Sequence, residues 1–270
     1  MPRRRNHRPD LSGLLILDKR LGLSSASVVS VIRGTSGGAK VGHAGTLDPL
    51  ATGIVVVCLG KATKAVPLLM DAAKRYTAAV DLSAFSTTDD LEGDLSPVAA
   101  HPPPLESVHA ALARFIGEIM QTPPIHSAVS VGGRRAYSLA RGGRLVDDLT
   151  APEAIAPGAI SLLPRRVRID SIDVLEFEFP RLVIDVRCGK GVYIRSLARD
   201  IGKALTTGGH LSALRRTEVG PFTLAHARPL DAIPDRFGQE ELLDPAAFLP
   251  PPPPTPGWGP AEGPGSARRS

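Results

Sequence analysis

A glycine-rich loop around Asp48 is the part of this chain best suited to chemistry. From Gly42 to Gly53 it reads GHAGTLDPLATG, with one carboxylate between a helix-like segment and an apolar strand. The glycines, Gly45 among them, permit positive φ and close backbone approach, and Pro49 pushes Asp48 away from the α region. An ionised Asp can act as nucleophile, base or electrostatic stabiliser. The loop therefore predicts a catalytic carboxylate, although an Asp that caps a turn would have the same local signature.

The distribution of other acids limits the chemistry that Asp48 could perform. A glycosidase usually presents two carboxyl groups, and no second acid lies near Asp48 in the sequence, which argues against that reaction. A separate acidic cluster does not match the spacing of a calcium loop, and we interpret it as a solvated turn and not as a metal site. This cluster consists of Asp89, Asp90, Glu92 and Asp94.

Histidine and tyrosine are the other side chains that could touch a substrate. His43 could contact a phosphate or orient the Asp48 loop, but a lone histidine more often has a purely structural role. The chain has only three tyrosines, Tyr76, Tyr137 and Tyr193. An extended single-strand platform stacks many bases on many rings, so this composition suits a pocket for one flipped base better.

Positive charge is concentrated in the second half of the chain. The whole chain carries +5, whereas residues 181–217 contain eight Arg and Lys against two Asp. Arg195, Arg199 and Lys203 recur at i, i+4 and i+8 on the polar side of an expected helix over 192–205. One such stripe could be an ordinary surface face, but several basic segments together favour a nucleic-acid partner.

The elements that must position these residues mix strands and helices without a regular βαβ rhythm. Strands are expected over 14–17, 54–59, 76–82 and 182–188, and a hairpin around Gly132-Gly133. Helices are expected from a Ser24 or Ser25 cap to Gly34, and over 61–72, 106–118, 192–205 and 240–248. The pattern predicts an α+β fold with a mixed, largely antiparallel sheet and flanking helices.

Composition along the chain suggests three regions. Residues 1–9 are expected to form a disordered basic arm, 10–229 a catalytic domain with a basic lobe near 121–150, and 230–270 a reduced C-terminal region with a proline-rich disordered tail. Cys58 and Cys188 are expected to be buried free thiols, and no metal-ligand spacing is visible. Without a signal core or a transmembrane run, we expect a soluble, cytoplasmic protein with no membrane contact.

Seven segments together resemble the TruB family, the tRNA pseudouridine-55 synthases, over residues 13–229. Any one of these segments would be a moderate signal, but their combination is highly specific. The matching segments are Gly13–Lys19, Gly22–Ser25, the Gly42–Gly53 loop, Lys74–Tyr76, Thr122–Tyr137, Gly189–Leu197 and Leu211–Thr217.

The resemblance implies a pseudouridine synthase fold and a specific reaction. Uridine in the T-loop of tRNA, at position 55, would be isomerised to pseudouridine by an enzyme that needs no cofactor, metal or obligate protein partner. The target base must leave its stack at a cost of a few kcal/mol. By resemblance, Asp48 is the nucleophile, Arg195 pairs with it, and Tyr76 stacks on the flipped base and could help remove the C5 proton.

Other site residues follow from the same resemblance. Tyr193 and Leu214 would line the base pocket, His43 would contact the RNA beside the flipped base, and Lys19 would support the loop. Two alternatives stay open. One is a non-catalytic RNA-binding or RNA-remodelling protein, and the other is a guide-RNA-dependent relative that works with partner proteins.

Overall fold

The computed structural model describes residues 10–124 and 160–250, together with residue 127 and short strands at 130–131, 134–135 and 145–146. The α-helices are α1 (Ser25–Thr35), α2 (Val66–Asp71), α3 (Leu105–Ala113) and α5 (Ile194–Leu205). The 3₁₀ helices are η1 (Gly60–Ala65), η3 (Leu224–His226), η4 (Leu230–Ala232), η5 (Gln239–Glu241) and η6 (Pro245–Ala247). The strands are β1 (Gly13–Lys19), β2 (Val41–His43), β3 (Ala51–Leu59), β4 (Lys74–Asp81), β5 (Ala84–Ser86), β6 (Leu95–Pro97), β7 (Gly117–Gln121), β8 (Ser130–Val131), β9 (Arg134–Arg135), β10 (Leu145–Val146), β11 (Ile160–Ser161), β12 (Arg165–Glu178), β13 (Arg181–Cys188), β14 (His210–Val219), β15 (Phe222–Thr223) and β16 (Arg228–Pro229).

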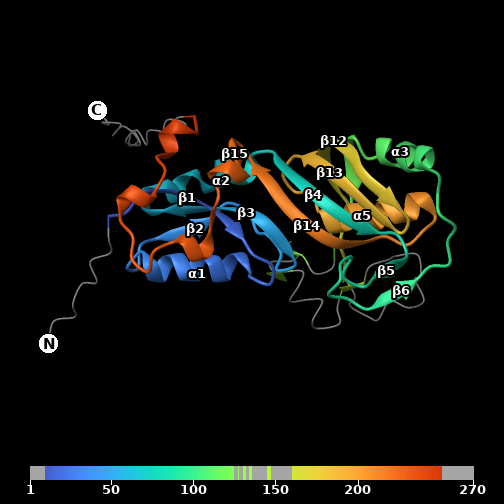
Figure 1. Cartoon of the computed structure of the whole chain (residues 1–270), viewed down its shortest axis with the longest axis horizontal. Coiled ribbons are helices and arrows are strands. Elements are labelled where there is room, and N and C mark those ends of the chain that lie inside the picture. Colours follow the sequence, from blue (N-terminus) through green and yellow to red (C-terminus); the bar gives the residue numbers. More distant parts are fainter. Residues whose placement is uncertain are drawn as a thin grey trace, which may run out of the picture.

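A ten-stranded mixed sheet organises the described chain. Its order is β16-β1-β3-β14-β4-β13-β12-β7, with β2 paired to β3 and β15 paired to β14. The pairs β1–β16 and β3–β14 are parallel and the others are antiparallel. The predicted mixed, largely antiparallel α+β sheet is therefore confirmed. Figure 1 shows β1 and α1 at one end of this sheet, and β12, α3 and α5 at the other.

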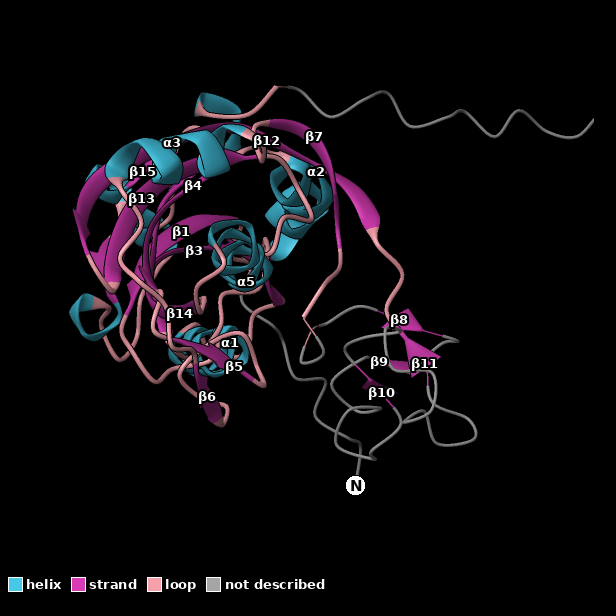
Figure 2. Cartoon of the chain, turned by 90° about the vertical axis from the view of Figure 1, so that its right-hand side faces the viewer, coloured by secondary structure: helices cyan, strands magenta, loops and turns pink. Residues whose placement is uncertain are grey.

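Alternating side chains give the sheet two buried faces. Leu15 and Leu17 of β1 belong to the larger core cluster, under α1, α3 and α5, whereas Leu14 and Ile16 belong to a smaller cluster. The smaller cluster includes Ala62 of η1, Leu69 of α2 and Phe222. Because successive strand residues point to opposite faces, a continuous apolar run in β1 and β3 is what a sheet covered on both sides requires. Figure 2 shows α1 and α5 on the same side of the sheet.

Most of the predicted elements are present, but two of the expected helices before β16 differ from the prediction. The helix expected over 61–72 is a 3₁₀ turn followed by a short α-helix, with Pro67 in the first turn of α2. The helix expected over 106–118 ends at Ala113, and β7 begins at Gly117 with φ +97°, a conformation that favours glycine. The predicted helix cap at Ser24 is confirmed, because its side chain accepts a hydrogen bond from the Ser27 N–H.

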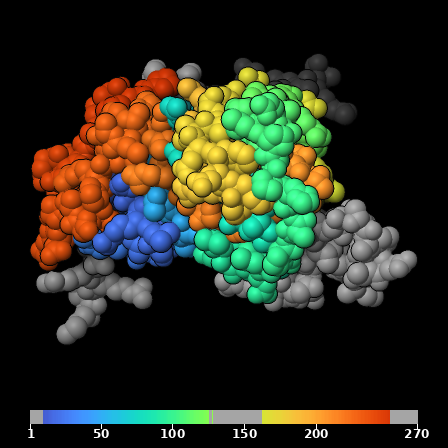
Figure 3. Space-filling view, turned by 45° about the vertical axis from the view of Figure 1, so that its right-hand side comes forward, coloured from blue at the N-terminus to red at the C-terminus, as the bar shows by residue number. Residues whose placement is uncertain are grey.

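The chain beyond β16 packs back on the first strand. The helix expected over 240–248 is wrong: η5 and η6 flank a bridge in which Leu243 and Leu14 exchange backbone hydrogen bonds of 2.8 and 2.9 Å. Leu230 and Leu242 belong to the larger core cluster. Figure 3 shows this C-terminal part of the described chain covering one end of the molecule, next to its first residues. The proposed boundary at 229 stays a prediction.

Several sequence predictions concern segments that lie outside the described residues. The arm at 1–9, most of the lobe near 121–150 and the tail after 250 lie outside the described residues. Strands β8 and β9 pair as the predicted hairpin. Cys58 and Cys188 are buried free thiols, as expected. Within the described ranges, no helix has the length and apolar character needed to cross a membrane.

Candidate active site

The loop between β2 and β3, which carries Asp48, is fixed by hydrogen bonds on both sides of this residue. The buried Ser25 hydroxyl donates to the Leu47 carbonyl at 3.1 Å and accepts from the Leu47 N–H at 2.8 Å. After Asp48, the Pro49 carbonyl accepts a hydrogen bond from the Gly22 N–H at 2.8 Å. Because the backbone is held at each neighbour, the Asp48 carboxylate starts from a defined position.

Arg195, in the first turn of α5, joins two carboxylates. Its Nη2 lies 3.0 Å from Asp48 Oδ2, and its Nη1 lies 3.2 Å from Asp90 Oδ2. The Asp90 side chain is 2% exposed and that of Arg195 is 8% exposed, whereas Asp48 is 36% exposed. The Asp48–Arg195 contact expected from the resemblance is present. Asp48 is therefore the member of this trio that a ligand from solvent can reach.

Asp90 is held as tightly as the arginine that it binds. Its carboxylate accepts hydrogen bonds from the Thr88 hydroxyl and from the Glu92 N–H, and an isolated bridge connects it with Leu211 of β14. No second acid lies near Asp48 in the sequence, but the folded chain brings Asp90 to the same arginine. Asp90 comes from a distant turn, and this proximity cannot be read from local sequence.

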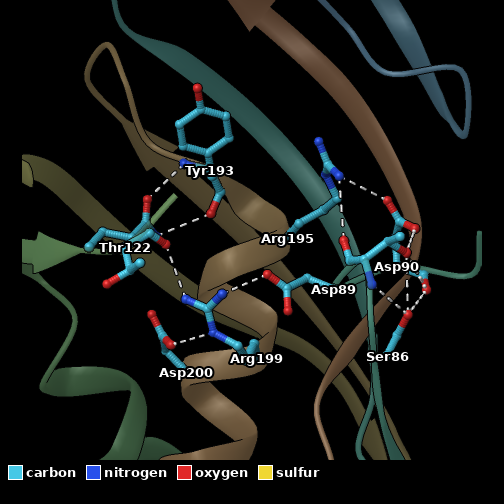
Figure 4. Close-up of polar contacts among 10 residues, drawn as sticks. Ser86, Asp89, Asp90, Thr122, Tyr193, Arg195, Arg199 and Asp200 are labelled. Atoms are coloured by element: carbon cyan, nitrogen blue, oxygen red, sulfur yellow. Dashed lines mark hydrogen bonds and ion pairs between the residues drawn. The ribbon is translucent and has the colours of Figure 1, made fainter. Parts of the chain in front are cut away.

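A second ion-pair layer lies one turn further along α5. Arg199 Nη1 contacts Asp89 Oδ2 at 2.7 Å, its Nε contacts Asp200 at 3.0 Å, and its Nη2 donates to the Thr122 carbonyl at 3.1 Å. Figure 4 shows this cluster beside the Arg195–Asp90 pair. Asp89 adopts φ +62°, a left-handed conformation that Asp tolerates better than most residues.

Two interpretations of the sequence need correction here. The acidic cluster is a solvated turn only in part: Glu92 and Asp94 are exposed, but Asp89 and Asp90 are buried in ion pairs. The basic stripe on α5 likewise does not face phosphates as a unit, because only Lys203 is exposed. The helical spacing was correct, but the turn after β5 supplies opposite charges that cover Arg195 and Arg199.

The two predicted site tyrosines lie within electrostatic range of Asp48. Burial raises the pKa of Tyr76, and the Asp48 charge raises it further, while Arg216 lowers it. Burial also raises the pKa of Tyr193, with Asp48 again acting in the same direction and Arg165 in the opposite one. Both phenols are thus protonated near neutrality and near enough to Asp48 to be affected by its charge.

Gln121, at the end of β7, was missed by the sequence analysis and positions Tyr193. Its side-chain Nε2 donates to the Tyr193 carbonyl at 3.1 Å, and its Oε1 accepts from the Tyr193 N–H at 2.9 Å. Gln121 is buried, at 2% exposure. A single amide therefore binds both backbone groups of the residue that precedes α5, and the Tyr193 carbonyl also accepts from the Leu197 N–H at 3.1 Å. A lone glutamine in the sequence gives no signal of such a role.

The remaining predicted residues surround the loop at different depths. His43 is half-buried at the end of β2, and burial lowers its pKa while the Gly45 backbone opposes this effect. Lys19 is buried, and desolvation lowers its pKa to about 8, with Asp48 opposing. Its Nζ donates to the Pro49 carbonyl at 3.4 Å, next to Asp48. Leu214 is 8% exposed and packs in the larger core cluster.

The residues of this site lie in a part of the chain that matches a known protein family. The model of the TruB family pseudouridylate synthase, N-terminal domain, matches residues 33–194, which include Asp48, Tyr76 and Tyr193. The chain belongs to the TruB family. The model of the tRNA pseudouridylate synthase B C-terminal domain matches residues 195–247 of this TruB-family chain, from Arg195 to η6.

Curated relatives of this TruB-family chain carry the name tRNA pseudouridine synthase B. The protein from Gluconobacter oxydans is 46% identical over 225 residues, which cover 83% of this chain and 63% of that protein. The protein from Francisella philomiragia is 40% identical over 240 residues, which cover 88% of this chain and 75% of that protein. The chain thus spans less than two thirds of the first relative.

Solved structures of related proteins share the TruB-family fold. A Cbf5-Nop10-Gar1 complex contains a chain that is 33% identical, with a TM-score of 0.57, over 78% of this chain and 50% of that one. An archaeal box H/ACA sRNP Nop10-Cbf5 complex contains a chain that is 27% identical, with a TM-score of 0.58, over 84% of this chain and 56% of that one.

The TruB-family site also contains a buried arginine, Arg216, which the sequence placed in a basic stretch and in the family-matching segment Leu211–Thr217 without assigning it a role. Arg216 of β14 is 1% exposed, and its guanidinium donates to the carbonyls of Ile54, Thr46 and Gly45 at 2.8, 3.2 and 3.2 Å. Its charge lowers the pKa of Lys19, of His43 and of Tyr76. Arg216 therefore lies at the centre of the site.

The chemistry available here is that of one accessible carboxylate beside two protonated phenols. Among the described residues, no three His, Cys, Asp or Glu side chains are grouped in a way that could hold a metal ion. Asp48 and Asp90 approach the same guanidinium, so their negative charges are separated by a cation. Such a site can direct one carboxylate at a bound base or sugar.

Proposed function

We propose that this chain isomerises uridine to pseudouridine at position 55, in the T-loop of tRNA, with Asp48 as the nucleophile on a flipped-out base. The observation that carries the proposal is the geometry of Asp48. Its carboxylate is held 3.0 Å from Arg195 Nη2 and remains 36% exposed, and its charge acts on the phenols of Tyr76 and Tyr193. The names of the relatives point to the same reaction on tRNA.

The proposed reaction is balanced without an external electron donor or acceptor. The bond between the sugar C1′ and the base N1 breaks, the base turns over, and C1′ bonds to C5. The C5 proton leaves and N1 gains a proton, so substrate and product are isomers. Tyr76 would stack on the base and could help remove the C5 proton, and Tyr193 and Leu214 would line its pocket. No cofactor, metal or obligate protein partner is part of this proposal.

Outer contacts complete the proposed roles. His43 would contact the RNA beside the flipped base, since it lies at the end of β2 where the Asp48 loop begins. Lys19 would support the loop through the Pro49 carbonyl. The T-arm would be the part of the tRNA that is bound, and the protein would act in the cytoplasm.

The direct test uses an unmodified tRNA transcript whose uridines carry tritium at C5. We expect the purified chain alone to release tritium, and Asp48→Asn to lower the rate by a factor of about 10³ or more. Asp170→Asn is a matched control, because Asp170 is 34% exposed and also pairs with an arginine, Arg168, at 2.8 Å. This control should keep the wild-type rate.

Two outcomes would contradict the proposal. If the wild type binds tRNA as tightly as Asp48→Asn does but releases no tritium, the chain is a non-catalytic RNA-binding or RNA-remodelling protein. If tritium is released only after guide RNA and partner proteins are added, the chain works like the assemblies to which its structural relatives belong.

A further inference from the structure

Arg216 lies on β14, between β3, which follows the loop of the proposed nucleophile, and β4, which carries the stacking tyrosine. Strand β14 pairs in parallel with β3, where Arg216 lies opposite Gly53, and antiparallel with β4, where Arg216 lies opposite Tyr76. Directly opposed residues on neighbouring strands point to the same face of the sheet with Cβ atoms about 5 Å apart. The register alone therefore brings the Arg216 side chain beside Tyr76.

The same side chain holds the Asp48 loop at both of its ends. Gly45 and Thr46 precede Asp48 and Ile54 follows it, and all three carbonyls accept hydrogen bonds from the Arg216 guanidinium. Gly53, with φ +102°, allows this approach, because a Cβ at that position would lie 2.2 Å from the Arg216 carbonyl oxygen. One rigid fork of donors thus defines where the loop lies relative to β14.

A buried arginine destabilises a sheet unless its guanidinium is well hydrogen-bonded. Moving a guanidinium out of water carries a penalty that only well-placed hydrogen bonds offset, and an apolar side chain of similar volume often stabilises a fold equally well. Here the acceptors are two carbonyls of the Asp48 loop and one of β3, and Tyr76 is the residue opposite on β4. These contacts therefore favour a role for Arg216 in positioning the Asp48 loop and Tyr76, and not in stability alone.

We propose that Arg216 is a positioning residue, which fixes the Asp48 loop and the Tyr76 phenol relative to one another in the isomerisation proposed above. The inference rests on that proposed function, because the two groups it aligns are those that would attack and stack on the substrate. Arg216 acts through these groups and would not itself touch the RNA, since it is 1% exposed.

Kinetics of two variants give the first test. Arg216→Lys keeps a positive charge but loses the planar fork, and Arg216→Met removes both. We expect kcat for tritium release to fall about 10- to 100-fold in Arg216→Lys, and further in Arg216→Met, because small misplacements of reacting groups are costly. KM should stay within about threefold of wild type, since binding contacts to RNA are unchanged.

Controls separate positioning from folding. Arg181→Lys is a suitable control, because Arg181 forms an exposed ion pair with Glu176 on neighbouring strands. It should keep the wild-type kcat. Thermal unfolding of each variant shows whether it is folded at the assay temperature, and if Arg216→Met is not, Arg216→Lys alone supplies the result. A double variant with Tyr76→Phe should lose less activity than the product of the two single losses, because both changes disturb the same alignment.

A titration of Tyr76 tests the inference without any enzymatic turnover. The charge of Arg216 and its hydrogen bond to the phenol both lower the pKa of Tyr76, against the larger effect of burial. Removing them in Arg216→Met should shift the tyrosinate absorbance of Tyr76 to higher pH. The chain has three tyrosines, so subtracting the titration of Tyr76→Phe isolates this signal. Faster hydrogen exchange of amides in 44–54 should accompany the shift in both Arg216 variants.

The outcomes distinguish this inference from the proposed function. If the wild type releases no tritium, the proposed function fails, and the titration and the exchange of 44–54 still decide whether Arg216 connects the loop to Tyr76. Wild-type kcat in a folded Arg216→Lys would overturn the inference. So would a Tyr76 titration and an exchange of 44–54 that are the same in the wild type and in Arg216→Met.

Discussion

Asp48 and Asp90 contact the two Nη nitrogens of one arginine, Arg195, at 3.0 and 3.2 Å, although one carboxylate reaches solvent and the other does not. The exposed member would meet the substrate, and the buried member would hold the arginine. This division of roles follows from burial, because a buried cation needs a fixed partner that water cannot replace.

Asp90→Asn should therefore impair catalysis without removing the nucleophile. The change removes the charge of one carboxylate that contacts Arg195, which lets the guanidinium shift and carry Asp48 with it. We expect a loss of about 10² in kcat and a loss of about 3 kcal/mol in unfolding free energy. Single-turnover tritium release and urea denaturation measure these two quantities. Asp94→Asn, an exposed change in the same segment, should alter neither, and an equal loss there would refute the role of Asp90.

Gly53→Ala should destabilise the protein severely. The residue has φ +102°, and the added methyl group would meet the backbone of Arg216 at 2.2, 2.8 and 2.9 Å. Backbone cannot move aside as a flexible side chain can, so β3 and β14 would have to separate. We expect a loss of more than about 3 kcal/mol in unfolding free energy, or no folded protein at all.

Gly34→Ala is the matched control for that change. Gly34 lies in α1 with nothing within 4 Å of an added Cβ. Alanine at a helical position without strain should stabilise by about 1 kcal/mol. Thermal unfolding of the two variants should thus shift in opposite directions, and a similar small shift in both would show that β3 and β14 are not in close contact.

The sequence predicts the elements of this fold better than their ends. Alternating or continuous apolar runs located β1, β3, β4 and β13, because a strand buried on one or both faces must have that pattern. The pattern fails where one short element follows another. Apolar residues from 61 to 72 have helical spacing, yet Pro67 lacks an N–H and starts a new helix at Val66.

Charge pairing across the fold is what the sequence could not predict. Arg195 and Arg199 form part of a basic stripe when α5 is considered alone, and Asp89 and Asp90 form part of a polar turn. Which of them are buried depends on β14 and β4 bringing the turn after β5 against α5. Similarly, Arg216 differs from the neighbouring Arg215 only in its strand face: Arg215 pairs with Asp18 at 2.7 Å and is partly exposed.

Lys19 should give the stability a specific pH dependence. Burial lowers its pKa to about 8 from 10.5, so the native state disfavours the charged lysine. Below pH 8, both native and unfolded states are protonated and the destabilisation is fully present, on the order of 3 kcal/mol. Between pH 8 and 10.5 the native state loses the proton first, so stability rises relative to a chain without this group.

Comparison with Lys19→Met isolates this effect. The variant has no titratable group at position 19. The unfolding free energy of the variant minus that of the wild type should therefore decrease as pH rises from 8 to 10.5, because only the wild type gains stability there. Urea denaturation at several pH values measures it, and below pH 8 the difference should be constant. A difference that does not vary with pH over the whole range would mean that Lys19 titrates like an exposed lysine.

Gln121→Leu should damage the active site through Tyr193. Leucine has a similar volume but removes both hydrogen bonds to Tyr193, at 2.9 and 3.1 Å. The Tyr193 carbonyl keeps the Leu197 N–H as a donor at 3.1 Å, but the Tyr193 N–H loses its Gln121 acceptor. A backbone N–H without an acceptor costs about 1–3 kcal/mol when water cannot reach it, so the first turn of α5 should loosen. Because Tyr193 would line the base pocket and Arg195 follows two residues later, we expect KM for tRNA to rise and kcat to fall, each by about tenfold.

Gln239→Leu is the matched control, because it makes the same substitution at a glutamine that binds the backbone of another residue. Gln239 makes an equivalent pair of hydrogen bonds to the N–H and carbonyl of Ser12, at 3.0 and 2.8 Å, in an exposed setting. Water can replace these bonds, so stability should change by less than about 1 kcal/mol and both kinetic constants should be unchanged. Steady-state tritium release and thermal unfolding of the two variants check the pair. If Gln239→Leu matched Gln121→Leu in its kinetic losses, the effect would arise from general loosening of the fold and not from the position of Tyr193.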